Sequence, residues 1–83
     1  MPLYMDVHHK IDDLNAEVAR LAHEKDLAVQ QKYGVRYLRY WFDDGVGKVF
    51  CLVQAPSKEA ATAVHREAHG HLADEIFEVQ EGA

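Results

Sequence analysis

Histidine and aspartate are the residues of this chain most able to do chemistry, because six histidines occur among only 83 residues. His65 and His69 are four residues apart, which places both imidazoles on one side of a helix, where they can bind one metal ion. Asp6 and His8 share one face of an expected strand. Imidazole and carboxylate together suit nickel, zinc, copper or iron. The spacing therefore predicts a site for a divalent transition metal.

Ordinary structural roles for the same residues stay open at this point. His69 and His71 flank Gly70, where an imidazole can simply stack on the last carbonyls of a helix. His23 and Asp26 are three residues apart on an expected helix and could form only a hydrogen bond. Cys51 lies in the middle of an expected strand, where a cysteine is more often a small buried hydrophobic residue than a nucleophile.

The hydropathy pattern predicts six elements that must position these residues. Alternating apolar residues predict the first strand, and a helical apolar stripe predicts the long helix that follows. Asp12 or Asp13 is expected to cap that helix, and Gly34 is expected to end it. Asp43 to Gly47 is typical of a hairpin turn, and Ser57 is expected to cap the second helix. The expected ranges are strands at 3–8, 35–42, 48–54 and 75–79, and helices at 11–31 and 58–69.

This order predicts an α+β, ferredoxin-like βαββαβ fold in a single domain spanning residues 1–83. Right-handed crossovers place both helices on one face of a four-stranded antiparallel sheet, so the other face is bare. Tyr37, Arg39 and Trp41 are expected to share one face of the second strand, and a bare face with such aromatics would be a large apolar patch. A second copy covering that face would give a homodimer, a dimeric α+β barrel.

The same topology is expected to gather most of the polar chemistry at one rim of the domain. The first strand, the hairpin and the second helix all end there. The residues expected at this rim are His8, His9, His69, His71, Asp12, Asp13, Asp43, Asp44, Asp74 and Glu75.

Composition excludes several classes of protein. Fourteen acidic against nine basic residues give a net charge of −5, which opposes general nucleic-acid binding. No apolar run is long enough to span a bilayer, and the first residues do not form a signal peptide. One cysteine cannot form an internal disulfide, so a cytoplasmic protein is expected.

Five short blocks in register resemble the DUF4242 family, whose characterised type is a small nickel-binding protein of an actinomycete. The blocks are Met5-Asp6-Val7-His8, His23-x-x-Asp26-Leu27-Ala28, Phe50-Cys51-Leu52 with Ala55-Pro56-Ser57, His65, and Asp74-Glu75-Ile76-x-Glu78-Val79. The resemblance covers nearly the whole chain and implies a ferredoxin-like dimeric barrel and nickel binding. The positions it carries over as candidates are Asp6, His8, His23, Asp26, Cys51 and His65.

The sequence therefore leaves two main alternatives for the function. A third alternative is a purely structural role as a dimerising partner of another protein. The first is a non-enzymatic, homodimeric protein that binds nickel or another divalent metal such as zinc. Its candidate ligands are Asp6, His8, His23, Asp26, His65, His69 and His71. The alternative is an enzyme or small-molecule binding module in which Asp6 and His8 transfer protons inside the barrel. Its cofactor-binding or pocket residues would be Tyr37, Arg39, Trp41 and Cys51.

Overall fold

The computed structural model describes residues 1–82 and contains four strands and two helices. The order of the elements is the expected βαββαβ, so the ferredoxin-like α+β fold is confirmed. The elements are β1 (Leu3–His8), α1 (Ala16–Val29), the short 3₁₀ helix η1 (Gln30–Tyr33), β2 (Arg36–Asp43), β3 (Lys48–Gln54), α2 (Lys58–Ala68) and β4 (Glu75–Val79).

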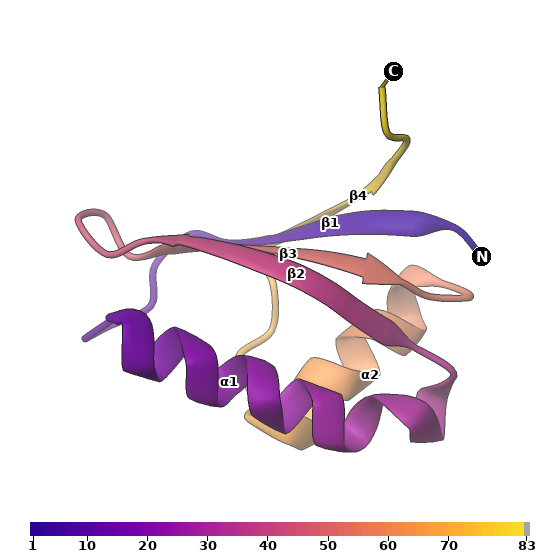
Figure 1. The fold of residues 1–83 in the computed structure, drawn as a ribbon, viewed down its shortest axis with the longest axis horizontal. Helices are drawn as coiled ribbons and strands as arrows, with labels where there is room; N and C mark the ends of the chain where they lie inside the picture. The colour runs from indigo at the N-terminus through magenta and orange to yellow at the C-terminus, as the bar shows by residue number, and fades with distance from the viewer. Residues whose placement is uncertain (83) are drawn as a thin grey trace.

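The strands form one antiparallel sheet in the order β2-β3-β1-β4. Figure 1 shows α1 and α2 on the same side of this sheet, with the opposite face uncovered. We call that uncovered side the open face. Because β1 lies between β3 and β4, its alternate side chains point either into the layer between sheet and helices or toward the open face.

The inward side chains of β1 are Tyr4, Asp6 and His8, and all three are buried. They share one face, as expected, but this is the face that the helices cover. The alternative function placed Asp6 and His8 inside the barrel, between two sheets. That expectation was wrong, because both side chains lie between the sheet and the helices.

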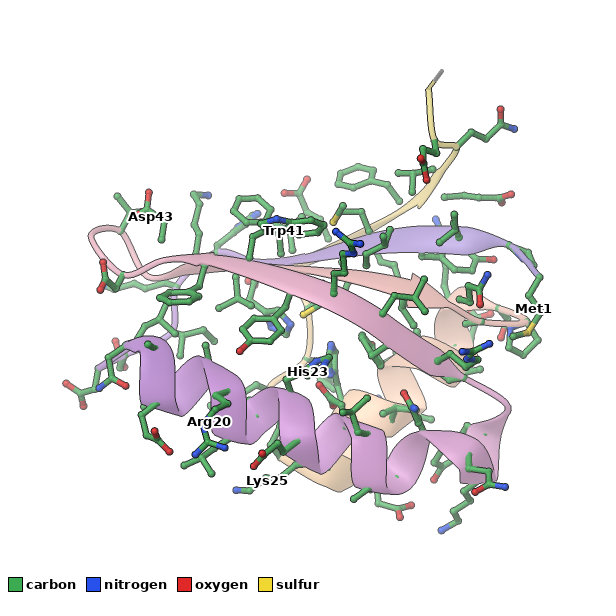
Figure 2. All side chains as sticks on the ribbon, in the orientation of Figure 1. Met1, Arg20, His23, Lys25, Trp41 and Asp43 are labelled. Atoms are coloured by element: carbon green, nitrogen blue, oxygen red, sulfur yellow. The ribbon has the colours of Figure 1, made fainter. Side chains whose placement is uncertain are left out.

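A β-bulge in β2 separates three residues that were expected to share a face. Tyr37 pairs with Val53 and Arg39 pairs with Leu52, so Leu38 is one extra residue in β2. Tyr37 points toward the helices and is 4% exposed. Figure 2 shows Trp41 on the open face. Its side chain is 47% exposed. The expectation of a common face was wrong because it assumed strict alternation along the strand.

Helix α1 begins later than the sequence predicted. Asn15 caps it, and the Asn15 side chain accepts a hydrogen bond from the Val18 backbone N–H. Asp12 and Asp13 belong instead to the preceding turn, in which Asp13 has a φ of 59°. The helix ends through η1 at Gly34, whose φ of 67° is the expected left-handed conformation.

Helix α2 and the sheet enclose the main hydrophobic core. Ser57 caps α2 by accepting a hydrogen bond from the Ala60 backbone N–H, as expected. The core includes Tyr4, Val35, Tyr37, Val53, Ala55, Ala61 and Val64. Helix α1 buries only Ala19 and Asp26 fully, so the layer beneath it is packed less completely. None of the helices in the described residues is long and apolar enough to cross a membrane.

Candidate functional site

The Asp6 carboxylate lies in the middle of a buried polar cluster beneath the sheet. Asp6 projects from β1 and is 1% exposed. Its Oδ2 accepts a hydrogen bond from the Tyr37 hydroxyl at 2.9 Å and lies 3.0 Å from His65 Nε2. Its Oδ1 lies 3.4 Å from His8 Nε2 and has no hydrogen-bond partner among the described residues. One oxygen of a fully buried carboxylate is thus held, and the other is free.

His65 joins this carboxylate to a second one. The imidazole projects from α2, with Nε2 facing Asp6 and Nδ1 2.8 Å from Asp26 Oδ1 on α1. Burial alone would lower the pKa of His65, but its hydrogen bonds with Asp26 and Asp6 outweigh burial and raise that pKa to about 9. In the metal-free protein His65 is therefore a cation held between two anions.

The pKa of Asp6 reflects the same arrangement from the other side. Burial pushes this pKa upward, but the contacts with His65 and His8 outweigh burial and hold it well below its usual range. The pKa of Asp26 is also lowered, since burial is outweighed there by the hydrogen bonds of His65 and His69. Both carboxylates are consequently ionised and available as ligands.

His69 completes a second polar group around Asp26. The expected position of the two histidines on one side of a helix is confirmed, since the ring centroids of His65 and His69 lie 4.9 Å apart. His69 Nε2 lies 3.1 Å from Asp26 Oδ1, and His69 Nδ1 accepts a hydrogen bond from the His71 backbone N–H at 3.1 Å. Because Nδ1 accepts, neutral His69 must carry its proton on Nε2 and donate it to Asp26.

Cys51 brings a sulfur atom to the first group. Cys51 lies opposite Asp6 in the register of β1 and β3, and its thiol is buried. Burial raises the pKa of the Cys51 thiol strongly, so the thiol is protonated in the metal-free protein. A buried thiol of raised pKa is a poor nucleophile, but a metal ion can displace its proton.

Two overlapping sets of side chains could therefore hold a metal ion. Asp6, His8, Cys51 and His65 each offer a ligand atom, as do Asp26, His65 and His69, and within each set these atoms lie within 4.8 Å of one another. In the second set, Asp26 Oδ1 already contacts both His65 and His69. The first set contains the free Asp6 Oδ1. A cation fits the first set better, because it would supply the missing partner of a buried anionic oxygen.

The remaining candidate residues lie outside both sets. His23 stacks on Tyr40 with ring centroids 4.7 Å apart, and Asp26 uses its hydrogen bonds on His65 and His69 rather than on His23. His71 is exposed and contributes its backbone N–H instead of its ring. Arg39 and Trp41 lie on the open face, away from the cluster, whereas Tyr37 holds Asp6.

Only some of the residues expected at the rim belong to the buried polar cluster. His9 is exposed and contacts Asp74 and Glu75 at the surface. The chemistry instead lies deeper, where β1, β3 and α2 meet. Sequence reasoning named Asp6, His8 and His65 of the first set as candidate ligands and Cys51 as a candidate pocket residue, but it did not predict their grouping, since the contacts of His65 depend on how α2 crosses the sheet.

A pocket of about 210 Å³ lies beside the cluster, between α1 and the sheet. His8, Cys51, Asp26, His69, His71 and His23 line its polar part. Leu14, Val18, Ala22, Tyr40 and Val49 line much of the rest. Sequence reasoning missed Tyr40, because the bulge in β2 that turns it toward the helices has no clear signal in the sequence.

Comparison with known proteins found one matching family and one similar solved structure. The family model "Nickel responsive protein SCO4226-like" matches residues 4–79. The chain is 40% identical to the protein of the solved structure "Crystal structure analysis of SCO4226 from Streptomyces coelicolor A3(2)". That match covers 98% of this chain and 99% of the other, with a TM-score of 0.90. No curated protein matches the chain significantly. The DUF4242 label stays a prediction.

Proposed function

The chain belongs to the SCO4226-like family of nickel-responsive proteins, and we propose that Asp6, His8, Cys51 and His65 bind one nickel ion. The observation that carries this proposal is the Asp6 Oδ1 atom, which is buried and has no hydrogen-bond partner among residues 1–82. An ionised oxygen in that position is costly unless a cation or a donor meets it.

The kinds of ligand atom support a transition metal. The set offers two imidazole nitrogens, one carboxylate oxygen and one thiolate sulfur. Hard cations such as calcium and magnesium prefer oxygen ligands, whereas nitrogen and sulfur ligands favour nickel, zinc or copper. The family description favours nickel among these.

Asp26 and Tyr37 are proposed to orient the ligands without binding the metal. His65 would bind through Nε2 and donate its Nδ1–H to Asp26, which is a common arrangement for metal-bound histidine. The Tyr37 hydroxyl donates to Asp6 Oδ2 and so turns Oδ1 toward the metal. Binding displaces a proton from His65 and another from the Cys51 thiol.

We further propose that the protein acts as a homodimer in the cytoplasm. The open face carries Trp41 and Phe77, which are exposed by nearly half of their surfaces. An apolar patch of this kind favours burial against a second copy. The free Cys51 thiol is suited to a reducing compartment.

The test is calorimetric titration of nickel into tag-free protein that has never contacted a nickel column. We expect about one ion per chain in the parent protein. Asp6→Asn, which leaves a neutral amide in place of the carboxylate, is expected to weaken nickel binding at least 100-fold. Cys51→Ser is expected to abolish the thiolate-to-nickel absorption band.

His69→Gln is the matched control, because His69 belongs only to the second group. This variant is expected to keep nickel affinity within about threefold of the parent. Loss of binding in His69→Gln with retention in Asp6→Asn would move the site to Asp26 and contradict the proposal. A circular dichroism spectrum checks that each variant is folded.

A further inference from the structure

Four imidazoles form a continuous row between the surface and the buried polar cluster. The ring centroids of His71 and His69 lie 5.4 Å apart, and those of His69 and His65 lie 4.9 Å apart. The row continues from His65 to His8 at 5.0 Å. We propose that His71 and His69 are the entry route for nickel, which they bind transiently and pass to the proposed ligands. The inference rests on the proposed nickel site, because it describes how an ion reaches that site.

The pocket between α1 and the sheet marks the side from which the proposed ligands can be reached. His8 and Cys51 belong to its lining and keep small exposed fractions of 4% and 6%. Asp6 and His65 are buried more deeply and are not among the described residues that line the pocket. An ion that comes through the pocket therefore meets His8 and Cys51 first among the proposed ligands.

The outer two imidazoles of the row line the same pocket. His69 and His71 both belong to the lining, and His71 is exposed. Leu21 and Lys25 of α1 are further exposed residues of the lining, so the pocket opens to solvent. The pocket and the row of imidazoles thus both lead from solvent to His8.

The hydrogen bonds of His69 suit this residue to bind an ion briefly. Its Nε2 donates to Asp26 Oδ1 at 3.1 Å, which leaves the lone pair of the neutral ring on Nδ1. A metal-bound imidazole commonly donates its other N–H to a carboxylate in this way. The hydrogen bond that Nδ1 accepts from the His71 backbone N–H is exposed, so an arriving ion can take the place of that N–H.

Charge and the number of ligand atoms give the transfer its direction. The Asp26 carboxylate is the acidic group of the pocket lining and attracts a cation to His69, while the exposed charge of Lys25 is screened by water. The outer pair offers two imidazoles, whereas the buried set offers four ligand atoms and binds the ion more tightly. The transfer replaces one metal ligand by another without a change of oxidation state, and the protons displaced from His65 and Cys51 pass to water.

The test is stopped-flow mixing of tag-free, metal-free protein with nickel chloride, followed through the thiolate-to-nickel absorption band expected from Cys51. Mixing nickel-loaded protein with excess EDTA gives the release rate. An entry route changes the barrier in both directions equally, so it alters both rates but not their ratio, the Kd. We expect His71→Gln and His69→Gln each to slow uptake and release about tenfold. The Kd of both variants is expected to stay within about threefold of the parent value.

His9→Gln is the matched control, because His9 is an exposed histidine outside the row that contacts Asp74 and Glu75. This variant should take up and release nickel at the parent rates. Parent rates in both His71→Gln and His69→Gln would overturn the entry route and leave the proposed nickel site standing. Two tightly bound ions per parent chain, reduced to one in His69→Gln, would make the outer histidines a permanent second site and would also overturn it. A parent chain that takes up no nickel in calorimetry would overturn both proposals.

Discussion

At the scale of single residues, the central fact is that one imidazole lies between two ionised carboxylates. His65 faces Asp6 through Nε2 and Asp26 through Nδ1. In the metal-free protein the proton on Nε2 supplies positive charge where the metal would supply it. Cation binding at Asp6 would therefore replace the charge of that proton, and it would also supply a partner to Asp6 Oδ1, which has no hydrogen-bond partner among residues 1–82.

The stability of the metal-free protein should fall as pH rises from about 6.5 to 9. The pKa of His65 is raised to about 9 when folded, from 6.5, so protonated His65 stabilises the fold fully below 6.5 and loses that effect through 9. The titratable groups around it are Asp6, Asp26, His8, His69, Tyr37 and Cys51. Urea unfolding in the presence of a chelator should show a loss of up to about 3 kcal/mol. A stability that is flat or rises across this range would contradict the arrangement.

Tyr37→Phe should weaken nickel binding by about 10-fold to 100-fold, the usual effect of removing a group that orients a metal ligand. The variant removes the hydroxyl that donates to Asp6 Oδ2 but keeps the ring in the core. Calorimetric titration gives the affinity. Tyr40→Phe on the same strand is the control, since Tyr40 contacts His23 rather than Asp6, and it should bind nickel as the parent does. Equal effects in the two variants would argue against a role for the hydroxyl.

Residue types and spacing were sufficient to name Asp6, His8 and His65 as candidate ligands, whereas Cys51 was expected only as a pocket residue or as a position carried over from the family resemblance. The i, i+4 spacing of His65 and His69 correctly predicted neighbouring rings, yet the two rings have different partners. His65 reaches Asp6 because α2 crosses beneath β1, which is a tertiary contact between positions 59 residues apart. Local periodicity carries no information about such a contact.

At the scale of elements, patterning predicted nearly every strand and helix, and the differences have local causes. The start of α1 was placed too early because Asp12 and Asp13 are good capping residues in isolation. Asn15 takes that role, since Asp13 has a positive φ and belongs to the turn. The bulge at Leu38 was not predicted, because nothing in the aromatic-rich sequence of β2 marks one position as an extra residue.

Asn15→Ala should destabilise the protein by about 1 kcal/mol, because the first turn of α1 then loses the acceptor for the Val18 N–H. Thermal or urea unfolding measures the change. Asn15→Ser keeps a capping oxygen and should recover most of the stability. If Asn15→Ala and Asn15→Ser were equally stable, the helix would have to begin elsewhere.

At the scale of the whole molecule, the chain has two working sides. The helices and the inner face of the sheet enclose the polar cluster and its pocket. The open face carries exposed aromatic residues, among them Trp41 (Figure 2). The topology alone predicted that this face is left uncovered, since both helices lie on the other face of the sheet. The side on which each aromatic of β2 lies depended on the bulge.

Trp41→Lys should convert the proposed dimer into a monomer, because a buried unpaired charge on the open face opposes association. Light scattering after gel filtration should show half the mass of the parent protein. Each monomeric chain should still bind about one nickel ion, since Trp41 lies on the opposite face from Asp6. Val46→Lys, an equally drastic change at an exposed hairpin residue, should leave the mass unaltered. A parent-like mass for Trp41→Lys would exclude this face as the interface.

The alternation along β1 has a thermodynamic consequence. Asp6 and His8 point to the metal side, and their neighbours Met5 and Val7 point to the open face of the same strand. A movement of β1 that closes ligands around an ion carries the open face with it. Binding on the two sides is then linked. If bound metal changes the affinity for a molecule on the open face by some factor, that molecule changes the affinity for metal by the same factor.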